Sequence, residues 1–139
     1  MPGAREYGDV SSYPLDSNVS LDAEGYLLNF TSNDDLQKVP AAGANVFGVN
    51  YKSTADQDGN LETGGQIGTV RHSAAFPVRA AAESYSPGDD VYVSGSTAGV
   101  VSAADTAQER VGVVVEKDPL DLTTTSDGDE TVLVAFSFN

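Results

Sequence analysis

The chain has 139 residues, with 21 acidic residues against seven basic ones, a net charge of -14 and no cysteine. This length fits a single domain with one modest hydrophobic core. A chain without cysteine has no disulfide framework, no thiolate metal site and no cysteine nucleophile. The basic residues are scattered, whereas phosphate contacts need clustered Lys and Arg, so we expect no nucleic-acid partner.

The charge balance also indicates the salt concentration of the environment in which the protein works. Asp outnumbers Glu, and three of the basic residues are Lys. A surface this acidic repels itself at ordinary salt, and molar salt shortens the Debye length to roughly 3 Å, which screens that repulsion. The composition therefore favours a halophilic archaeon or its virus over an ordinary acidic bacterial or phage protein.

Residues 1–24 are polar, with single apolar residues spaced along them and several Pro and Gly that discourage a helix. We predict an extended N-terminal arm that lies on another surface. A disordered tail or an ordinary edge strand are the alternatives, because chain termini are commonly disordered unless they are tied down. The side chains that we expect to anchor this arm on a partner are Tyr7, Val10, Tyr13 and Leu15.

The middle of the chain shows runs of β-branched and aromatic residues between turn signals, which is typical of strands. Ser32–Asp35 is expected to cap one helical turn through Lys38, which Pro40 ends. Pro77 places the start of its strand at an edge or a bulge. The predicted strands of this region are 26–30, 46–51, 66–71 and 76–82.

Residues 85–116 have the most informative pattern. Ser86-Pro-Gly-Asp89 is turn chemistry, because Pro fixes φ at one central position and Gly frees the next. Val91 and Val93 then alternate with polar residues along a strand, Gly95–Gly99 is a short hairpin loop, and a return strand starts at Val100. A further strand begins at Arg110.

A last strand is predicted over residues 131–138, after an acidic loop. Short strands separated by turns, without an amphipathic helix of useful length, indicate an all-β fold, either a small antiparallel barrel or a sandwich. We therefore divide the chain into an arm, residues 1–24, and a β-barrel domain, residues 25–139. No apolar run approaches the ~20 residues of a membrane span, and the N-terminus lacks the apolar core of a signal peptide.

The order of motifs in the second half resembles the small all-β head-decoration, or capsid cement, proteins of tailed viruses. The matching segments are Gly88-Asp-Asp-Val-Tyr-Val93, the hairpin Gly95–Gly99, Ala103-Ala104 and Val111-Gly-Val-Val-Val-Glu116. The resemblance covers roughly residues 67–138. It implies a structural virion protein, often a homo-trimer, that is made in the host cytoplasm and clamps neighbouring major capsid protein subunits at the capsid surface.

One segment and one residue can be considered as a metal site and as a catalytic group. Asp56–Glu62 places oxygen ligands at alternate positions, but the Gly and Glu positions of a calcium loop hold Leu61 and Ile67, so an acidic hydrated loop is the better interpretation. His72 is the one histidine. Its neighbour Ser73 would lie on the opposite face of a strand and so does not pair with it as a nucleophile, and we expect a surface or partly buried strand histidine and not a catalytic base. We predict no catalytic residue, no cofactor and no metal site.

The sequence therefore predicts a capsid-binding protein and not an enzyme. Other classes remain open at this stage: a tail, neck or spike subunit, a ligand-binding β-barrel of cupin-like type, or a host surface module. The polar loops Thr54–Gly65 and Asp118–Asp129 are further candidates for contacts, from their position alone.

Overall fold

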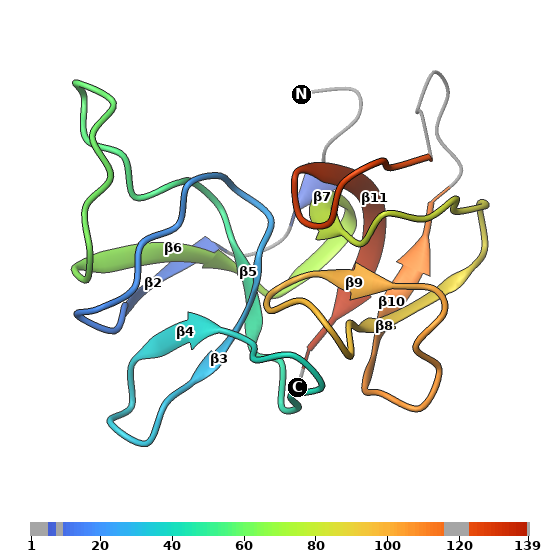
Figure 1. Ribbon diagram of the computed structural model, residues 1–139. Coiled ribbons are helices and arrows are strands. Elements are labelled where there is room, and N and C mark those ends of the chain that lie inside the picture. Colours follow the sequence, from blue (N-terminus) through green and yellow to red (C-terminus); the bar gives the residue numbers. More distant parts are fainter. Residues whose placement is uncertain (1–5, 8–9, 116–122, 139) are drawn as a thin grey trace.

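The computed structural model describes residues 6–7, 10–115 and 123–138 (Figure 1). These residues form strands and loops and contain no helix, and accordingly no helix of the length and apolarity needed to cross a membrane. The all-β prediction is confirmed. The strands are β1 (Glu6–Tyr7), β2 (Val10–Pro14), β3 (Leu27–Phe30), β4 (Leu36–Lys38), β5 (Gly48–Asn50), β6 (Gln66–Val70), β7 (His72–Ala80), β8 (Asp90–Val93), β9 (Val101–Ser102), β10 (Arg110–Val114) and β11 (Glu130–Ser137).

The second half of the chain closes into a barrel. Its strands follow the order β7-β11-β10-β8-β9, and β9 returns to β7 through a parallel pair, Ala80 with Val101. β1 adds to the outside of this ring by pairing with β7. Each barrel strand places a valine in one buried cluster, so valine side chains fill the interior of the barrel. These valines are Val78, Val91, Val101, Val111 and Val132, at most 3% exposed.

The first half forms a second lobe beside the barrel, which we call the five-stranded lobe (Figure 1). Its antiparallel sheet has the order β2-β6-β5-β3-β4. An isolated parallel bridge between Leu15 and Leu36 connects the end of β2 to β4, and the Asp16 N–H donates to the Leu36 carbonyl at 2.9 Å. The sheet therefore curls around its own small core, which includes Leu15, Leu21, Leu28, Leu36 and Ile67.

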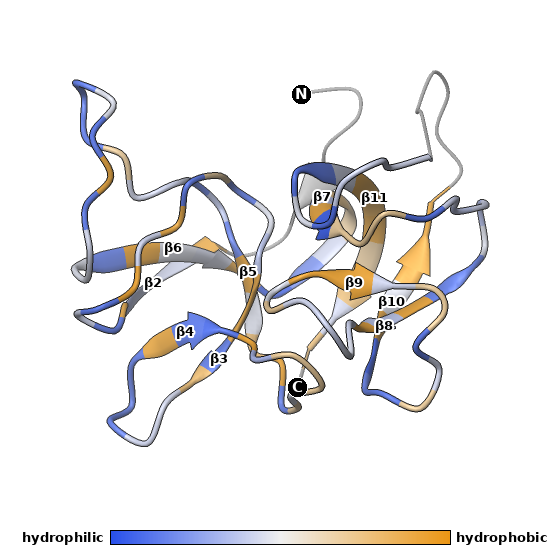
Figure 2. Ribbon diagram, viewed as in Figure 1, coloured by the Kyte–Doolittle hydropathy of each residue, from blue (hydrophilic) through white to orange (hydrophobic). Residues whose placement is uncertain are grey.

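The larger core cluster joins the two lobes. Leu27 and Val49 of the five-stranded lobe, both fully buried, belong to the same cluster as Phe76 and Val78 of β7. Figure 2 shows hydrophobic colours along the strands and hydrophilic colours on most of the loops. Each fully buried Leu, Val or Phe contributes about 1.5–3 kcal/mol relative to an exposed one. Because they share this cluster, we expect the two lobes to unfold together.

Polar contacts hold the same junction. The Glu109 carboxylate accepts the backbone N–H groups of Asn45 and Val46, both at 2.8 Å, from the other lobe. Gly25 adopts φ +97° and packs against β7, where a Cβ would lie 2.7 Å from the Pro77 carbonyl oxygen. Glycine is required at this turn for its positive φ and for this close approach.

Most predicted strands are present, but two local predictions are wrong. Pro77 does not mark the start of its strand, because it lies inside β7, opposite Leu133. The second concerns the predicted helical turn. Leu36–Lys38 forms strand β4 and not a helical turn, because Leu36 is fully buried and pairs with Phe30 across a hairpin. The tight turn that precedes it has Asp34 at φ 64°. Burial of Leu36 outweighs the local capping preference of residues 32–35.

The segment predicted as an arm is extended, but its described part from residue 10 onward lies within the fold and does not project from it. β2 pairs with β6 along its full length, from Val10 with Val70 to Pro14 with Gln66. Leu21, further along the segment, is fully buried. The spaced apolar residues of this segment therefore serve the lobe's own sheet and core. The physical reason is that β6 needs a partner on that edge.

Candidate functional site

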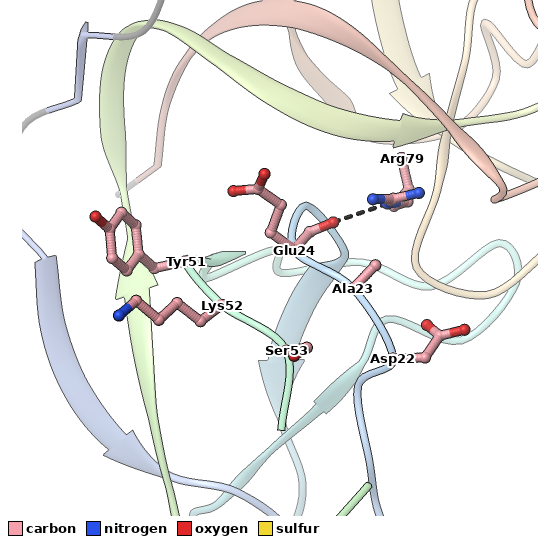
Figure 3. Close-up of a pocket in the computed structure, with 7 residues that line it drawn as sticks. All are labelled: Asp22, Ala23, Glu24, Tyr51, Lys52, Ser53 and Arg79. Atoms are coloured by element: carbon pink, nitrogen blue, oxygen red, sulfur yellow. Dashed lines mark hydrogen bonds between the residues drawn. The ribbon is translucent and has the colours of Figure 1, made fainter. Parts of the chain in front are cut away.

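A polar hollow lies where the two lobes meet. It has a volume of about 460 Å³ and lies between the turn before β3, the segment that follows β5 and the C-terminal end of β7 (Figure 3). Most of the side chains that line it are polar (Figure 3). The lining residues are Asp22, Ala23, Glu24, Tyr51, Lys52, Ser53 and Arg79.

Arg79 lines this hollow, and its guanidinium donates hydrogen bonds to main-chain carbonyl groups of the fold. Its Nε donates to the Glu24 carbonyl at 2.8 Å, drawn as a dashed line in Figure 3, and its Nη1 donates to the Asp129 carbonyl at 3.1 Å. The same group stands 5.9 Å from the centre of the Tyr26 ring. These bonds join β7 to two loops, so the hollow is best interpreted as a joint between the lobes.

Tyr26 is held on several sides at this joint. Its hydroxyl donates to Asp22 Oδ1 at 2.6 Å, and Lys38 Nζ lies 3.9 Å from the ring centre. Burial, followed by the hydrogen bond to Asp22 and its negative charge, raises the pKa of Tyr26 to about 12. The phenol therefore stays protonated at neutral pH and acts as a donor.

A second feature lies on the five-stranded lobe, where three aromatic rings meet. Tyr13 of β2, Phe30 of β3 and Phe47 before β5 form what we call the aromatic patch. The ring centres of Phe30 and Phe47 are 4.6 Å apart, and Tyr13 lies 4.8 Å from Phe47 in an edge-to-face arrangement. Phe30 is 41% exposed, whereas the other two rings are half-buried.

A cation already lies on this patch. The Arg71 guanidinium carbon stands 4.1 Å from the centre of the Phe47 ring, and Arg71 Nε donates to the Phe47 carbonyl at 2.8 Å. A planar guanidinium over an aromatic face is a favourable cation–π arrangement. The patch is therefore an aromatic surface that accepts positive charge.

The backbone around the patch is unusual. Asp34, Ala42 and Asn45 have φ values of 64°, 58° and 59°, in the left-handed region that non-glycine residues seldom adopt. Asp34 belongs to the β3–β4 turn, and the other two belong to the loop that leads to Phe47. A hydrogen bond from Asn29 Nδ2 to the Ala44 carbonyl, at 2.9 Å, links that loop to β3.

Each residue of the predicted contact set has a distinct position. Tyr13 belongs to the aromatic patch, and Val10 is 41% exposed on the opposite face of β2. Leu15 is 4% exposed and belongs to the small core of its lobe. Tyr7 pairs with Ser73 through β1, and its side chain lies outside the described part of the chain. The structure thus brings Tyr13, and not the whole set, to the patch.

The two segments with a chemical interpretation are hydrogen-bonded elements of the fold. Asp56 Oδ1 accepts the N–H groups of Asp58 and Asn60, both at 2.9 Å, so this carboxylate stabilises its own turn. His72 is exposed at the start of β7, and its Nδ1 lies 2.8 Å from Ser137 Oγ. Within the described ranges, no group of three or more His, Cys, Asp or Glu side chains is placed to hold a metal ion.

Sequence reasoning missed two residues that position these surfaces. Asn50 is fully buried, and its side chain binds three main-chain groups at 2.7–2.9 Å: Tyr26 N–H and the carbonyls of Ala23 and Lys52. Glu109 bridges the lobes as described above. Asn50 could have been recognised from the sequence, because it is a polar amide inside the apolar run of residues 46–51. No feature of the sequence marks Glu109 as a bridge between the lobes.

No known family model matches the chain, and no curated protein matches it.

Proposed function

We propose that this protein is a structural virion protein that decorates the capsid of a tailed virus and stabilises it by binding across major capsid protein subunits, without catalysis. The observation that carries the proposal is the fold of residues 85–115. The motif order that resembles capsid cement proteins forms β8, its hairpin to β9, and β10, all within the closed barrel. A barrel filled by valine side chains supports a binding role better than a ligand-holding lumen.

The physical mechanism is the addition of buried area across subunit boundaries. A rigid protein that contacts two neighbouring subunits must be detached before the lattice can open, so its binding free energy adds to the stability of the shell. The two lobes share one core cluster and are joined by Arg79 and Glu109, which gives such a clamp the stiffness that it needs.

The test is quantitative peptide mass spectrometry on purified tailed virions from the culture of the source organism, kept at high salt. A copy number comparable to that of the major capsid protein supports decoration. A few copies per particle would indicate a subunit of the tail, neck or spike instead. Absence from the virions would refute the structural role. The mass of the purified protein in solution tests the homo-trimer that the resemblance implies.

We also propose a halophilic source, from the net charge of -14. The Debye length falls from about 10 Å at 0.1 M salt to about 3 Å at 1 M, so added salt weakens repulsion between the carboxylates. The melting temperature should therefore rise with added NaCl, and by a similar amount with KCl. A melting temperature that stays constant between 0.1 M and 1 M of either salt would contradict this origin.

A further inference from the structure

We propose that the aromatic patch (Tyr13, Phe30 and Phe47), with the neighbouring Asp34, is a docking surface for an arginine- or lysine-bearing face of a partner protein. In the capsid role, on which this inference rests, that face belongs to the major capsid protein shell. The closed barrel carries the sequence resemblance, but this inference assigns the contact to the five-stranded lobe.

The first argument is the distribution of exposed apolar side chains. The large apolar residues that are exposed in the described part are Val10, Phe30 and Leu61, at 41%, 41% and 50%, and all three lie on the five-stranded lobe. Val10 and Leu61 do not belong to the aromatic patch, and single exposed apolar residues are common on protein surfaces. Phe30 differs because its ring joins two other rings.

The second argument is charge. The chain carries a net charge of -14, so at this surface a second copy brings charge of the same sign, whereas a basic partner is attracted; a homo-trimer would form through other surfaces. The Arg71 guanidinium over Phe47 shows that this surface accepts an arginine side chain. Asp34 is exposed in the β3–β4 turn, four residues after Phe30, and adds a negative charge near that end of β3. An arginine of the partner would therefore find both an aromatic face and an anion.

The third argument is that the turn is already ordered. The Thr31 N–H donates to the Asp35 carbonyl at 2.7 Å, the Asn33 N–H donates to Thr31 Oγ1 at 3.1 Å, and the Thr31 hydroxyl bonds to the Asp35 carboxylate. Asp34 keeps its left-handed φ within this network. A turn that is fixed before binding loses little conformational entropy when it docks, and left-handed residues often gather at binding sites.

The experiment measures binding of the purified protein to shells assembled from the major capsid protein alone. Phe30 exposes 41% of its surface, on the order of 80 Å² for a phenylalanine. Burial of that area corresponds to about 30-fold in affinity. We therefore expect Phe30→Ala to weaken binding about 30-fold. Leu61→Ala removes a more exposed apolar side chain outside the patch and should change the affinity less than about twofold.

A second variant leaves the packing intact. Asp34→Asn keeps the size of the side chain and the tolerance for a left-handed backbone, and removes the charge. It should weaken binding about threefold at low salt and by less at high salt, because salt screens an exposed charge. Circular dichroism melting curves that match the wild type verify that each variant is folded.

The outcomes separate the two proposals. If the wild-type protein fails to bind the shells, the decoration role itself is refuted. If the wild type binds and both Phe30→Ala and Asp34→Asn bind equally well, the decoration role stands and the docking surface is refuted. Equal losses for Phe30→Ala and Leu61→Ala would also refute it, because they would indicate a general apolar contribution.

Discussion

Gly112 offers the sharpest test of the barrel packing. It lies in β10, within the Val-Gly-Val sequence of the resemblance, and pairs with Phe136 of β11. A Cβ at Gly112 would lie 2.2 Å from the Ala135 carbonyl oxygen and 2.9 Å from Val134 Cγ1. A backbone carbonyl has little freedom to move aside, so Gly112→Ala must separate β10 from β11 and weaken their ladder. We expect a loss of about 3 kcal/mol in the free energy of unfolding.

The matched control is Gly95→Ala in the β8–β9 loop. The atoms nearest to a Cβ there belong to the Asp105 carboxylate, at 3.7 Å, which is ordinary contact. This variant should stay within about 0.5 kcal/mol of the wild type. Urea unfolding followed by far-ultraviolet circular dichroism measures both. A transition midpoint of Gly112→Ala equal to that of Gly95→Ala would refute the close approach of β10 and β11.

Three further predictions concern single side chains. Asn50→Ala leaves three buried main-chain groups without their partner and should lower the free energy of unfolding by about 3 kcal/mol in urea titrations; an unchanged midpoint would contradict this role. Tyr26 has a pKa of about 12, so the folded state favours its protonated form. The stability from this group is fully present below pH 10 and is lost as the pH rises toward 12. Burial also raises the pKa of Tyr85, so absorbance titration at 295 nm should show two late-ionising tyrosines, of which Tyr26→Phe removes one; an unchanged late amplitude in the variant would contradict the assignment to Tyr26. Glu109→Gln keeps one acceptor for two backbone N–H groups of the other lobe and should cost about 1–2 kcal/mol; a melting temperature equal to that of the wild type would exclude this bridge.

The sequence predicts strands best where turn chemistry and alternation agree. Ser86–Asp89 forms the expected turn, in which the Ser86 N–H donates to Asp89 Oδ2 at 2.9 Å, and the valines of β8 are buried as their alternation predicts. Closure of the barrel was not predictable in this way. It depends on one parallel pair, Ala80 with Val101, whose partners lie in strands that no hairpin connects.

Local signals fail where tertiary contacts decide. The spacing of apolar residues in 10–24 fits an arm and an edge strand equally well. The structure contains the strand, because pairing with residues 10–14 satisfies the backbone groups at the edge of β6. The aromatic patch was beyond sequence reasoning for a similar reason. Tyr13, Phe30 and Phe47 are 17 residues apart from one to the next along the chain, and their meeting depends on the sheet order β2-β6-β5-β3.

Some of the acidic residues stabilise the fold through hydrogen bonds, in addition to giving the chain its net charge. Several carboxylates accept backbone N–H groups from distant loops: Asp105 binds Gly95, Asp127 binds Ala82, and Glu83 binds Ala103. Such charge-assisted bonds fasten loops that short strands cannot hold alone.

The cations are used differently. Four of them lie over aromatic rings: Lys38 and Arg79 over Tyr26, Lys52 over Tyr51, and Arg71 over Phe47. Arg110 forms an ion pair with Asp90 at 2.9 Å. The positive charges of the described residues are therefore engaged within the fold. Asp34 is exposed, and in the docking that we propose its carboxylate takes a cation from the partner, in addition to Arg71 of this chain, which already lies on Phe47.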